Sequence, residues 1–376
     1  MAARTVVISI NASWNIVNFR TGLLKALVAA GYRVVALAPR DAFSDRFPAL
    51  GVEYAPIEID NQGTSPLRDL ALLWRYRRAL ARLKPDILLA YTIKPNIYGS
   101  LAAHSLGIKV INNVSGLGTT FIKESLVTRI VRRLYKTAFR RSATVFFQNS
   151  DDQALFVSGR LVAVDRARRL PGSGVDLDRF RPSAEQPEGS GGFVFLMVAR
   201  LLWDKGVREY VEAARLVRVH FPDVRFQLLG FLDVPNRTAV GRAEVEGWVA
   251  EGLIEYLGEA EDVRGFLAIA DCVVLPSYRE GLPRTLLEAA AMARPLIAAD
   301  VPGCRDVVAN GINGYLCGVR DPASLAEAML KMLKLAPAER ERMGAAGRAR
   351  VEAEFDERIV IRRYLEAIEE ALASAR

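Results

Sequence analysis

The most constraining feature of this chain is a short apolar run that leads through a polar loop into a helix-forming segment. The run Cys272–Pro276 predicts a buried strand of a parallel sheet, because its residues are apolar throughout. Leu286–Met292 is rich in Leu and Ala, which favours helix. Pro283 suits the first helical position, where its missing N–H costs no hydrogen bond. Strand, tight loop and helix in this order predict an open α/β sheet.

The same stretch carries one carboxylate in the loop, Glu280, and a second in the helix, Glu288. Open α/β sheets bind phosphate-bearing ligands at such a helix N-terminus, where free backbone N–H groups favour an anion. Carboxylates beside a phosphate are unfavourable, so these two suit the neutral hydroxyls that sugars supply. Phosphate on the amides and hydroxyls on the acids describes a nucleotide-sugar site. A solvated Glu280 and a helix-capping Glu288 are the alternative, which spacing alone leaves open.

Length and composition narrow the class of protein. A chain of 376 residues exceeds the usual single core, which predicts two domains. No apolar run approaches the roughly 18 residues of a membrane span, and the N-terminal run is too short for a signal peptide. Three cysteines without motif spacing indicate reduced thiols in the cytoplasm.

The charge is divided unevenly along the chain. Residues 1–182 carry 27 Lys and Arg against 13 Asp and Glu, whereas residues 183–376 carry 24 against 30. The first half is therefore strongly basic and the second mildly acidic. Nucleic acid, an anionic membrane surface or an anionic substrate could each account for the basic half.

A repeated alternation of apolar runs and helical patterns divides the chain into two α/β domains. The predicted domains are residues 1–182, residues 183–355 and a final helix at 356–376, with a flexible linker at 183–192, which is rich in Gly, Ser and Pro. Strands are predicted at Thr5–Ile10, Arg33–Ala38, Ile87–Ala90, Lys109–Asn112, Ala143–Gln148, Phe193–Val198, Arg225–Leu229, Ile254–Leu257, Cys272–Pro276 and Pro295–Ala299.

Polar residues follow several of these strands. A loop is predicted at residues 12–20, followed by a helix from Gly22 to Ala30. The loop residues Asn15, Asn18 and Arg20 suit a site whose side chains bind polar groups or a phosphate. A capped loop with a surface arginine is the alternative. Further candidates at the carboxyl edge of the first sheet are Lys94, Asn113, Ser115 and Gly116.

Several sequence blocks together resemble glycosyltransferase family 4. They are EGLPRTLLE with the spacing Glu-x7-Glu, PLIAADVPGCRDVVANGINGYL, NASWNIVNFR, TIKPNIYG, FFQNSDD and LPGSGVD, and they cover nearly the whole chain. Within the family they look like the bacterial enzymes that add an N-acetylhexosamine, typically N-acetylgalactosamine, to a polyprenyl-diphosphate-linked saccharide. Many family members have a His where Ser115 stands, so no imidazole base is expected here.

The resemblance implies the GT-B fold, in which two doubly wound α/β domains face a cleft and the terminal helix crosses back to the first domain. It implies a UDP-sugar donor, retention of anomeric configuration and no metal requirement. Arg200 and Lys205 would meet the diphosphate, Glu280 the donor sugar and Glu288 the ribose; a surface pair is the alternative for the two cations. Other donor-side positions are Gly281, Leu282, Pro283, Gly230 and Ile254.

Residues 122–141 predict a basic amphipathic helix, with Leu126, Ile130 and Leu134 repeating every four residues. Such a helix can lie in the interface of an anionic bilayer, which would place the enzyme on the cytoplasmic surface of the inner membrane. A helix packed on a sheet with a basic outer face is the alternative. The expected membrane-facing cations are Arg129, Arg132, Arg133, Lys136 and Arg140.

Other functions remain open at this point. A family 4 enzyme could transfer another hexose to a capsule, O-antigen or exopolysaccharide lipid intermediate. A GT-B nucleotide-sugar epimerase would use the same donor groove without a lipid acceptor. Nucleic-acid binding by the basic half is disfavoured, because the chain has no recognisable binding motif and no interleaved aromatic platform.

Overall fold

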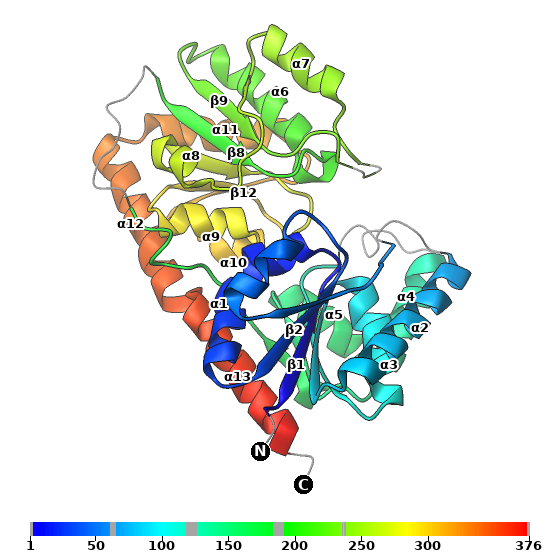
Figure 1. Cartoon of the computed structure of the whole chain (residues 1–376). Coiled ribbons are helices and arrows are strands. Elements are labelled where there is room, and N and C mark those ends of the chain that lie inside the picture. The colour runs from blue at the N-terminus through cyan, green and yellow to red at the C-terminus, as the bar shows by residue number, and fades with distance from the viewer. Residues whose placement is uncertain are drawn as a thin grey trace. The chain divides into compact units, whose positions relative to one another are not determined.

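The computed structural model describes residues 3–60, 65–117, 126–182, 192–234, 236 and 238–373. The chain divides into two compact units, which Figure 1 shows in colours that run along the chain. Unit 1 comprises Met1–Ser173 and Glu357–Arg376, and unit 2 comprises Gly174–Asp356. Residues 183–191 of the predicted linker lie outside the described residues.

Unit 1 is built on a parallel sheet with the strand order β3-β2-β1-β4-β5-β6-β7. Its strands are β1 (Thr5–Ser9), β2 (Arg33–Ala38), β3 (Glu53–Pro56), β4 (Ile87–Tyr91), β5 (Lys109–Val114), β6 (Thr144–Phe147) and β7 (Ala167–Arg169). Its helices are α1 (Ser13–Ala29), α2 (Pro66–Leu83), α3 (Ser100–Ser105), α4 (Leu126–Phe139), α5 (Ser150–Ser158) and α13 (Glu357–Ala373), with a π-helical turn η3 (Pro95–Gly99) before α3.

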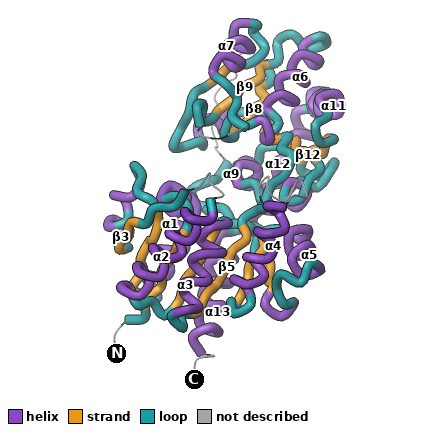
Figure 2. The backbone as a smooth tube through the Cα atoms, turned by 90° about the vertical axis from the view of Figure 1, so that its right-hand side faces the viewer, coloured by secondary structure: helices purple, strands orange, loops and turns teal. Residues whose placement is uncertain are grey.

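Both faces of the central part of this sheet are buried, which explains why β1, β2, β4 and β6 read as nearly continuous apolar runs. Successive side chains point to opposite faces, so Val6 and Ile8 pack with α1 and α13, whereas Val7 packs with α2 and α3. The helices α4 and α5 cover the β5–β7 part of that second face. Figure 2 shows α2, α3 and α4 standing side by side.

Unit 2 repeats the plan with the strand order β10-β9-β8-β11-β12-β13, again all parallel. Its strands are β8 (Val194–Val198), β9 (Arg225–Leu229), β10 (Glu255–Tyr256), β11 (Cys272–Leu275), β12 (Leu296–Ala299) and β13 (Gly314–Cys317). Its helices are η6 (Trp203–Lys205), α6 (Val207–Arg218), α7 (Arg242–Ala250), α8 (Arg264–Ile269), α9 (Arg284–Ala291), α10 (Cys304–Val307), α11 (Pro322–Lys334) and α12 (Pro337–Glu354).

The two strand orders confirm the predicted doubly wound architecture. In each unit the first strand lies between the second and the fourth, so the strand order reverses between β1 and β4 and between β8 and β11. Ligands of open α/β sheets bind at the carboxyl ends of the strands beside this switch point. The strands β3, β7 and β13 escaped prediction because they are short and carry polar or small residues.

The prediction of a loop over residues 12–20 is wrong, because α1 begins at Ser13. Ile16 is buried in the core one turn after that start, so the apolar face of the helix begins well before Gly22. Residues of the segment after β2 hold the first turn of α1. Ser13 Oγ donates to the Pro39 carbonyl at 2.8 Å, and the Trp14 N–H donates to Asp41 at 2.9 Å. Neither partner is adjacent in sequence, so local propensity could not reveal this start.

Two further helix boundaries differ from the sequence prediction. The helix after the Glu280 loop begins at Arg284, so Pro283 is the residue before the helix rather than its first residue. The basic helix predicted at 122–141 is described as α4, and residues 122–125 lie outside the described residues. Among the described residues, no helix is both long and apolar enough to span a lipid bilayer.

Candidate active site

The carboxyl ends of β8 and β11 bring together two residues that lie 75 positions apart in the sequence. Lys205 ends the short helix η6 after β8, and Glu280 lies in the loop after β11. The Lys205 Nζ donates to Glu280 Oε1 at 2.5 Å, with the two side chains 17% and 12% exposed. A lysine and a carboxylate thus form a largely buried ion pair at the switch point of the unit 2 sheet.

Two glycines hold the loops of this ion pair in backbone-to-backbone contact. Gly206 has φ +79°, and a Cβ there would lie 2.2 Å from the Pro276 carbonyl oxygen. Gly303 has φ +82°, and its Cβ would lie 2.5 Å from the carbonyl oxygen of Gly281. Only glycine fits both the conformation and the space at these positions. Sequence reasoning did not assign them a role, although each stands directly before a helix.

A second ion pair lies on α9, where Arg284 Nε donates to Glu288 Oε1 at 2.6 Å. Burial raises the pKa of the Glu288 carboxyl, and the neighbouring Arg284 acts against that rise. Thr285 donates from Oγ1 to the Val198 carbonyl at 3.1 Å, which ties the helix start to the end of β8. Sequence reasoning missed Arg284, although its i,i+4 spacing to Glu288 was the signal that could have found it.

Tyr278 fixes the loop between β11 and Glu280. Its hydroxyl donates to Glu209 Oε1 at 2.8 Å, and its backbone N–H donates to the Asp204 carbonyl at 2.9 Å. Burial, and then the Glu209 carboxylate, raise the pKa of Tyr278 to about 12, so the hydroxyl stays protonated as a donor. The guanidinium of Arg320 lies over the Tyr278 ring at 4.5 Å.

The other predicted donor-side residues lie at strand ends and in loops of unit 2. Arg200 is exposed just after β8, and Gly281, Leu282 and Pro283 form the loop that leads into α9. Gly230 follows β9 and lies so close to the residue after β8 that a Cβ would lie 1.7 Å from the Ala199 carbonyl oxygen. Ile254 is buried in the hydrophobic core of unit 2, next to β10.

In unit 1 the predicted residues are tied to their own surroundings. On α1, the Asn15 side chain donates to Asn11 Oδ1 at 3.1 Å and the Asn18 side chain donates to the Trp14 carbonyl at 3.0 Å. Lys94 follows β4 and forms an ion pair with Asp69 of α2 at 2.8 Å.

A buried polar cluster links the carboxyl ends of β4 and β5 to α13. Asn113 donates to the Tyr364 hydroxyl at 2.8 Å and accepts from Ser115 Oγ at 3.0 Å. Arg20 is buried with its guanidinium 4.8 Å from the centre of the Tyr91 ring, and its Nε has no hydrogen-bond partner among the described residues. Gly116 follows with φ +121°, whereas Gly118 lies outside the described residues.

Two hollows of unit 1 differ in their lining. One of about 560 Å³ is lined by the α4 side chains Arg132, Arg133, Lys136, Thr137 and Arg140 together with Gly159 and Leu161. Arg129 is exposed on the same helix.

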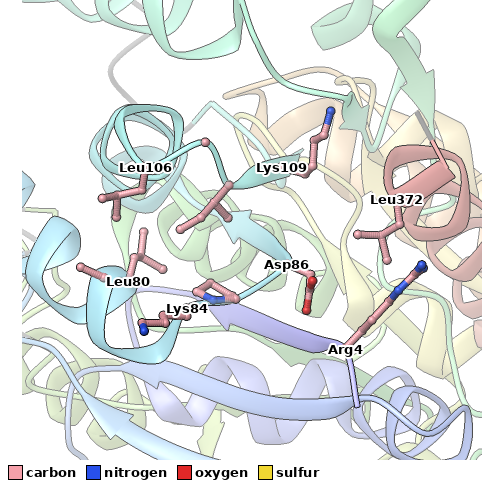
Figure 3. A pocket seen from close by; sticks show the side chains of 11 residues that line it. Arg4, Leu80, Lys84, Asp86, Leu106, Lys109 and Leu372 are labelled. Carbon is pink, nitrogen blue, oxygen red and sulfur yellow. The ribbon is translucent and has the colours of Figure 1, made fainter. Parts of the chain in front are cut away.

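The other hollow, of about 610 Å³, lies at the amino edge of the sheet, opposite the switch point (Figure 3). Its lining includes Arg4, Lys84, Asp86, Lys109 and Leu372, and Asp86 already accepts from the Thr5 N–H at 2.7 Å. Because open α/β sheets bind ligands at the other edge, the candidate site remains the switch point of unit 2.

Family models match both halves of the chain. The model described as a glycosyl transferase 4-like domain matches residues 17–173, and the model described as glycosyl transferases group 1 matches residues 192–335. The chain belongs to glycosyltransferase family 4. The second match contains Lys205, Glu280, Arg284 and Glu288, so both ion pairs lie inside the region that defines the family.

Two relatives of this family 4 glycosyltransferase are named for undecaprenol-linked sugars. It is 28% identical over 371 residues to the N,N'-diacetylbacillosaminyl-diphospho-undecaprenol alpha-1,3-N-acetylgalactosaminyltransferase of Campylobacter jejuni, covering 94% of this chain and 96% of the relative. It is 25% identical over 279 residues to the UDP-Gal:alpha-D-GlcNAc-diphosphoundecaprenol alpha-1,3-galactosyltransferase of Escherichia coli, covering 71% of each chain.

A solved structure of similar fold is that of Anabaena HepE in complex with UDP-glucose. The TM-score is 0.78 at 19% identity, and the match covers 98% of this chain and 99% of that chain. The seven-stranded and six-stranded parallel sheets of this glycosyltransferase therefore belong to the GT-B fold class, as predicted.

Proposed function

We propose that this glycosyltransferase transfers a sugar from a UDP-sugar to a saccharide linked to polyprenyl diphosphate, with retention of anomeric configuration. The observation that carries the proposal is the arrangement of two ion pairs, Lys205–Glu280 and Arg284–Glu288, at the switch point of unit 2. Together they offer cations for a diphosphate and carboxylates for hydroxyls within one short stretch of sheet edge.

The donor is assigned to these groups by charge. Lys205 and the exposed Arg200 would neutralise the diphosphate, and the amides of Gly281 and Leu282 would help to orient the sugar. Once Lys205 turns to phosphate, Glu280 becomes free to accept from sugar hydroxyls. Glu288 would accept from the ribose hydroxyls, for which it must be ionised, and Arg284 at 2.6 Å favours that form.

Catalysis follows from where charge develops. The bond from the donor's anomeric carbon to the diphosphate breaks, and the acceptor oxygen forms its bond on the same face of the sugar ring. The departing phosphate oxygen takes the proton of the acceptor hydroxyl. Negative charge grows on the leaving diphosphate, so fixed cations stabilise the transition state. These cations would neutralise the leaving diphosphate as a bound metal ion otherwise would, so we expect that the reaction needs no metal ion.

The acceptor and the sugar are proposed from the relatives. The C. jejuni relative, which matches nearly full length, is named for an undecaprenol-linked acceptor and for N-acetylgalactosamine transfer, and the E. coli relative is named for a UDP-sugar. N-acetylgalactosamine is therefore the proposed sugar. The basic residues of α4 suit an anionic bilayer that carries a lipid-linked acceptor, on the cytoplasmic face of the bacterial inner membrane.

The test is a panel of UDP-sugars assayed against polyprenyl-diphosphate-linked saccharides in detergent, with and without a metal chelator. We expect one α-linked product, greatest activity with UDP-N-acetylgalactosamine, and no loss of activity on chelation. NMR coupling of the anomeric proton reads the configuration of the new linkage. A β-linked product would contradict retention. Formation of an epimerised sugar nucleotide without any acceptor would show that the enzyme is an epimerase and not a transferase.

A further inference from the structure

The first two turns of α2 expose an apolar ridge, defined here as Leu67, Leu70 and Trp74. The spacing of three and four residues places these side chains on one face of the helix. Leu67 is 80% exposed and Trp74 67%, which makes Trp74 the only exposed one of the chain's four tryptophans. An amphipathic helix normally turns its large apolar residues into the core, so this face lacks a partner within the described chain.

A second apolar ridge begins α4, where Leu126, Val127 and Ile130 are exposed. A helix that joins two parallel strands runs back along the sheet, so α2 and α4 both begin at its carboxyl edge. Both helices also pack against η3, and Figure 2 shows them on the same face of unit 1. The two ridges therefore lie at the same end of one surface.

The remainder of this surface is positively charged. Within α2 and α4 there are nine Lys and Arg and a single acidic residue, Asp69. Asp69 faces inward, because it accepts from Lys94 and from the Tyr98 hydroxyl, each at 2.8 Å. The nine cations are Arg68, Arg75, Arg77, Arg78, Arg82, Arg129, Arg132, Arg133 and Lys136.

We propose that the two ridges and their cations form one membrane-docking surface that seats unit 1 on an anionic lipid bilayer. This deepens the proposed function, since a polyprenyl-linked acceptor lies in a membrane, and it adds α2 to the basic helix α4. Apolar side chains enter the interface while Lys and Arg contact lipid phosphates. Arg68 and Arg75 are paired with Asp60 and Glu58, at 3.0 Å and 2.8 Å. A second copy docked through the same face would still oppose the other cations of α2 and α4 to one another, so charge complementarity favours lipid.

The same contacts link docking to the candidate acceptor residues. Asp69 lies in the first turn of α2, between Leu67 and Leu70, and its ion pair holds Lys94 at the carboxyl end of β4. A bilayer seated on the ridges would therefore lie beside Lys94. The acceptor's diphosphate, which stays at the headgroup level, would reach this edge of the sheet without leaving the membrane.

The experiment removes the α2 ridge with the triple variant Leu67→Ser, Leu70→Ser, Trp74→Ser. Its matched control is Val164→Ser with Val219→Ser, because these valines are 74% and 75% exposed but lie outside both helices. Flotation uses vesicles of phosphatidylethanolamine with phosphatidylglycerol, compared with phosphatidylcholine alone. We expect vesicle partitioning of the triple variant to fall on the order of tenfold or more, and the control to match wild type. Trp74→Phe should abolish a blue shift of fluorescence on binding.

Charge is tested by Arg77→Gln with Arg78→Gln, against Lys331→Gln with Arg342→Gln in unit 2 as the control. The first pair should weaken binding to anionic vesicles on the order of tenfold or more, with an effect that shrinks as salt rises. Equal binding of the triple variant and wild type would overturn the proposal. So would salt-insensitive binding to phosphatidylcholine, or self-association that the triple variant abolishes, since either assigns the surface a different occupant.

Activity separates this inference from the proposed function. With a water-soluble short-chain acceptor the triple variant should keep wild-type turnover, whereas with a long-chain acceptor in vesicles it should lose turnover in parallel with binding. If wild type fails on every acceptor yet floats through α2 and α4, the proposed reaction is wrong and the docking surface stands. If wild type is active but the triple variant floats as well as wild type does, the proposed reaction stands and the docking surface is wrong.

Discussion

The two sheets share one strand order around the switch point, but different side chains lie there in each unit. In unit 2 the carboxyl edge carries two ion pairs, Lys205–Glu280 and Arg284–Glu288, whose side chains remain 12–17% exposed. In unit 1 the corresponding edge carries one ion pair, Lys94–Asp69, and a buried cluster in which Asn113 bonds to Tyr364 and Ser115. Besides an ion pair that can change partners, the edge of unit 1 therefore carries amides and hydroxyls that already satisfy one another.

This difference separates what each edge can do. An ion pair at the carboxyl edge of a sheet can exchange its partner for a diphosphate or a hydroxyl, because the ligand replaces the interaction that the pair gives up. A buried amide bonded to a buried hydroxyl has no such replacement, so breaking it costs stability. We therefore expect substitutions at the unit 2 edge to reduce activity, and substitutions in the unit 1 cluster to reduce stability.

The largest expected effect is that of Lys205→Ala. Loss of one fixed cation beside a leaving diphosphate should lower turnover by on the order of 100-fold, about 3 kcal/mol, while the fold is retained. Arg208→Ala is the matched control, because Arg208 is exposed nearby and stacks on Trp203 at 4.8 Å. Steady-state kinetics with saturating donor checks both. Near wild-type turnover in the Lys205 variant would remove this lysine from the mechanism.

Gly303→Ala tests whether the Glu280 loop must be held in place. The new Cβ would lie 2.5 Å from the Gly281 carbonyl oxygen, so the loop has to shift, and donor binding should weaken by about 1–3 kcal/mol. Gly311→Ala carries the same left-handed strain at φ +76° but meets nothing within 4 Å. Calorimetric titration should show weaker UDP-sugar binding for Gly303→Ala only. Equal weakening in both would assign the effect to backbone strain.

Much of this contrast could be predicted from sequence, and the part that could not depends on long-range contacts. The Glu280 loop and its flanking strand and helix follow from local pattern, and the doubly wound order follows from the β–α rhythm. The pairing of Lys205 with Glu280 spans 75 residues, and that of Asn113 with Tyr364 spans 251. No periodicity in one segment reports on such partners, which is why Asn113, predicted at an open edge of unit 1, is buried in the structure.

Tyr364→Phe tests the buried hydrogen-bonded cluster at the carboxyl edge of unit 1. It leaves the Asn113 amide without its acceptor at 2.8 Å, so the free energy of unfolding should fall by about 1–2 kcal/mol while UDP-sugar affinity stays unchanged. Tyr76→Phe is the comparison, because its partner Ser9 keeps a second bond to the Leu37 carbonyl at 2.7 Å and should lose less. Denaturant melts give both values. Loss of UDP-sugar binding in Tyr364→Phe would show that the two edges are not independent.

The smallest expected effect is a pair of opposite pH dependences, one in each unit. Burial raises the pKa of Glu288 in unit 2, whereas the hydrogen bond from Arg33 lowers the pKa of Glu53 in unit 1. The stability that Glu288 contributes is complete at low pH and is lost as the pH rises through its raised pKa. The stability that Glu53 contributes is present at neutral pH and is lost as the pH falls through its lowered pKa.

Thermal melts from about pH 4 to pH 7 should therefore give slopes of opposite sign for two isosteric variants. Relative to wild type, Glu288→Gln should gain stability as the pH rises, because it removes a buried carboxyl whose ionisation is unfavourable. Glu53→Gln should lose stability over the same range, because it removes a carboxylate that its arginine stabilises, and the change should be slight since both side chains are exposed. Slopes of the same sign would mean that Arg284 outweighs burial at Glu288, which would then be held as a fixed anion even without the donor.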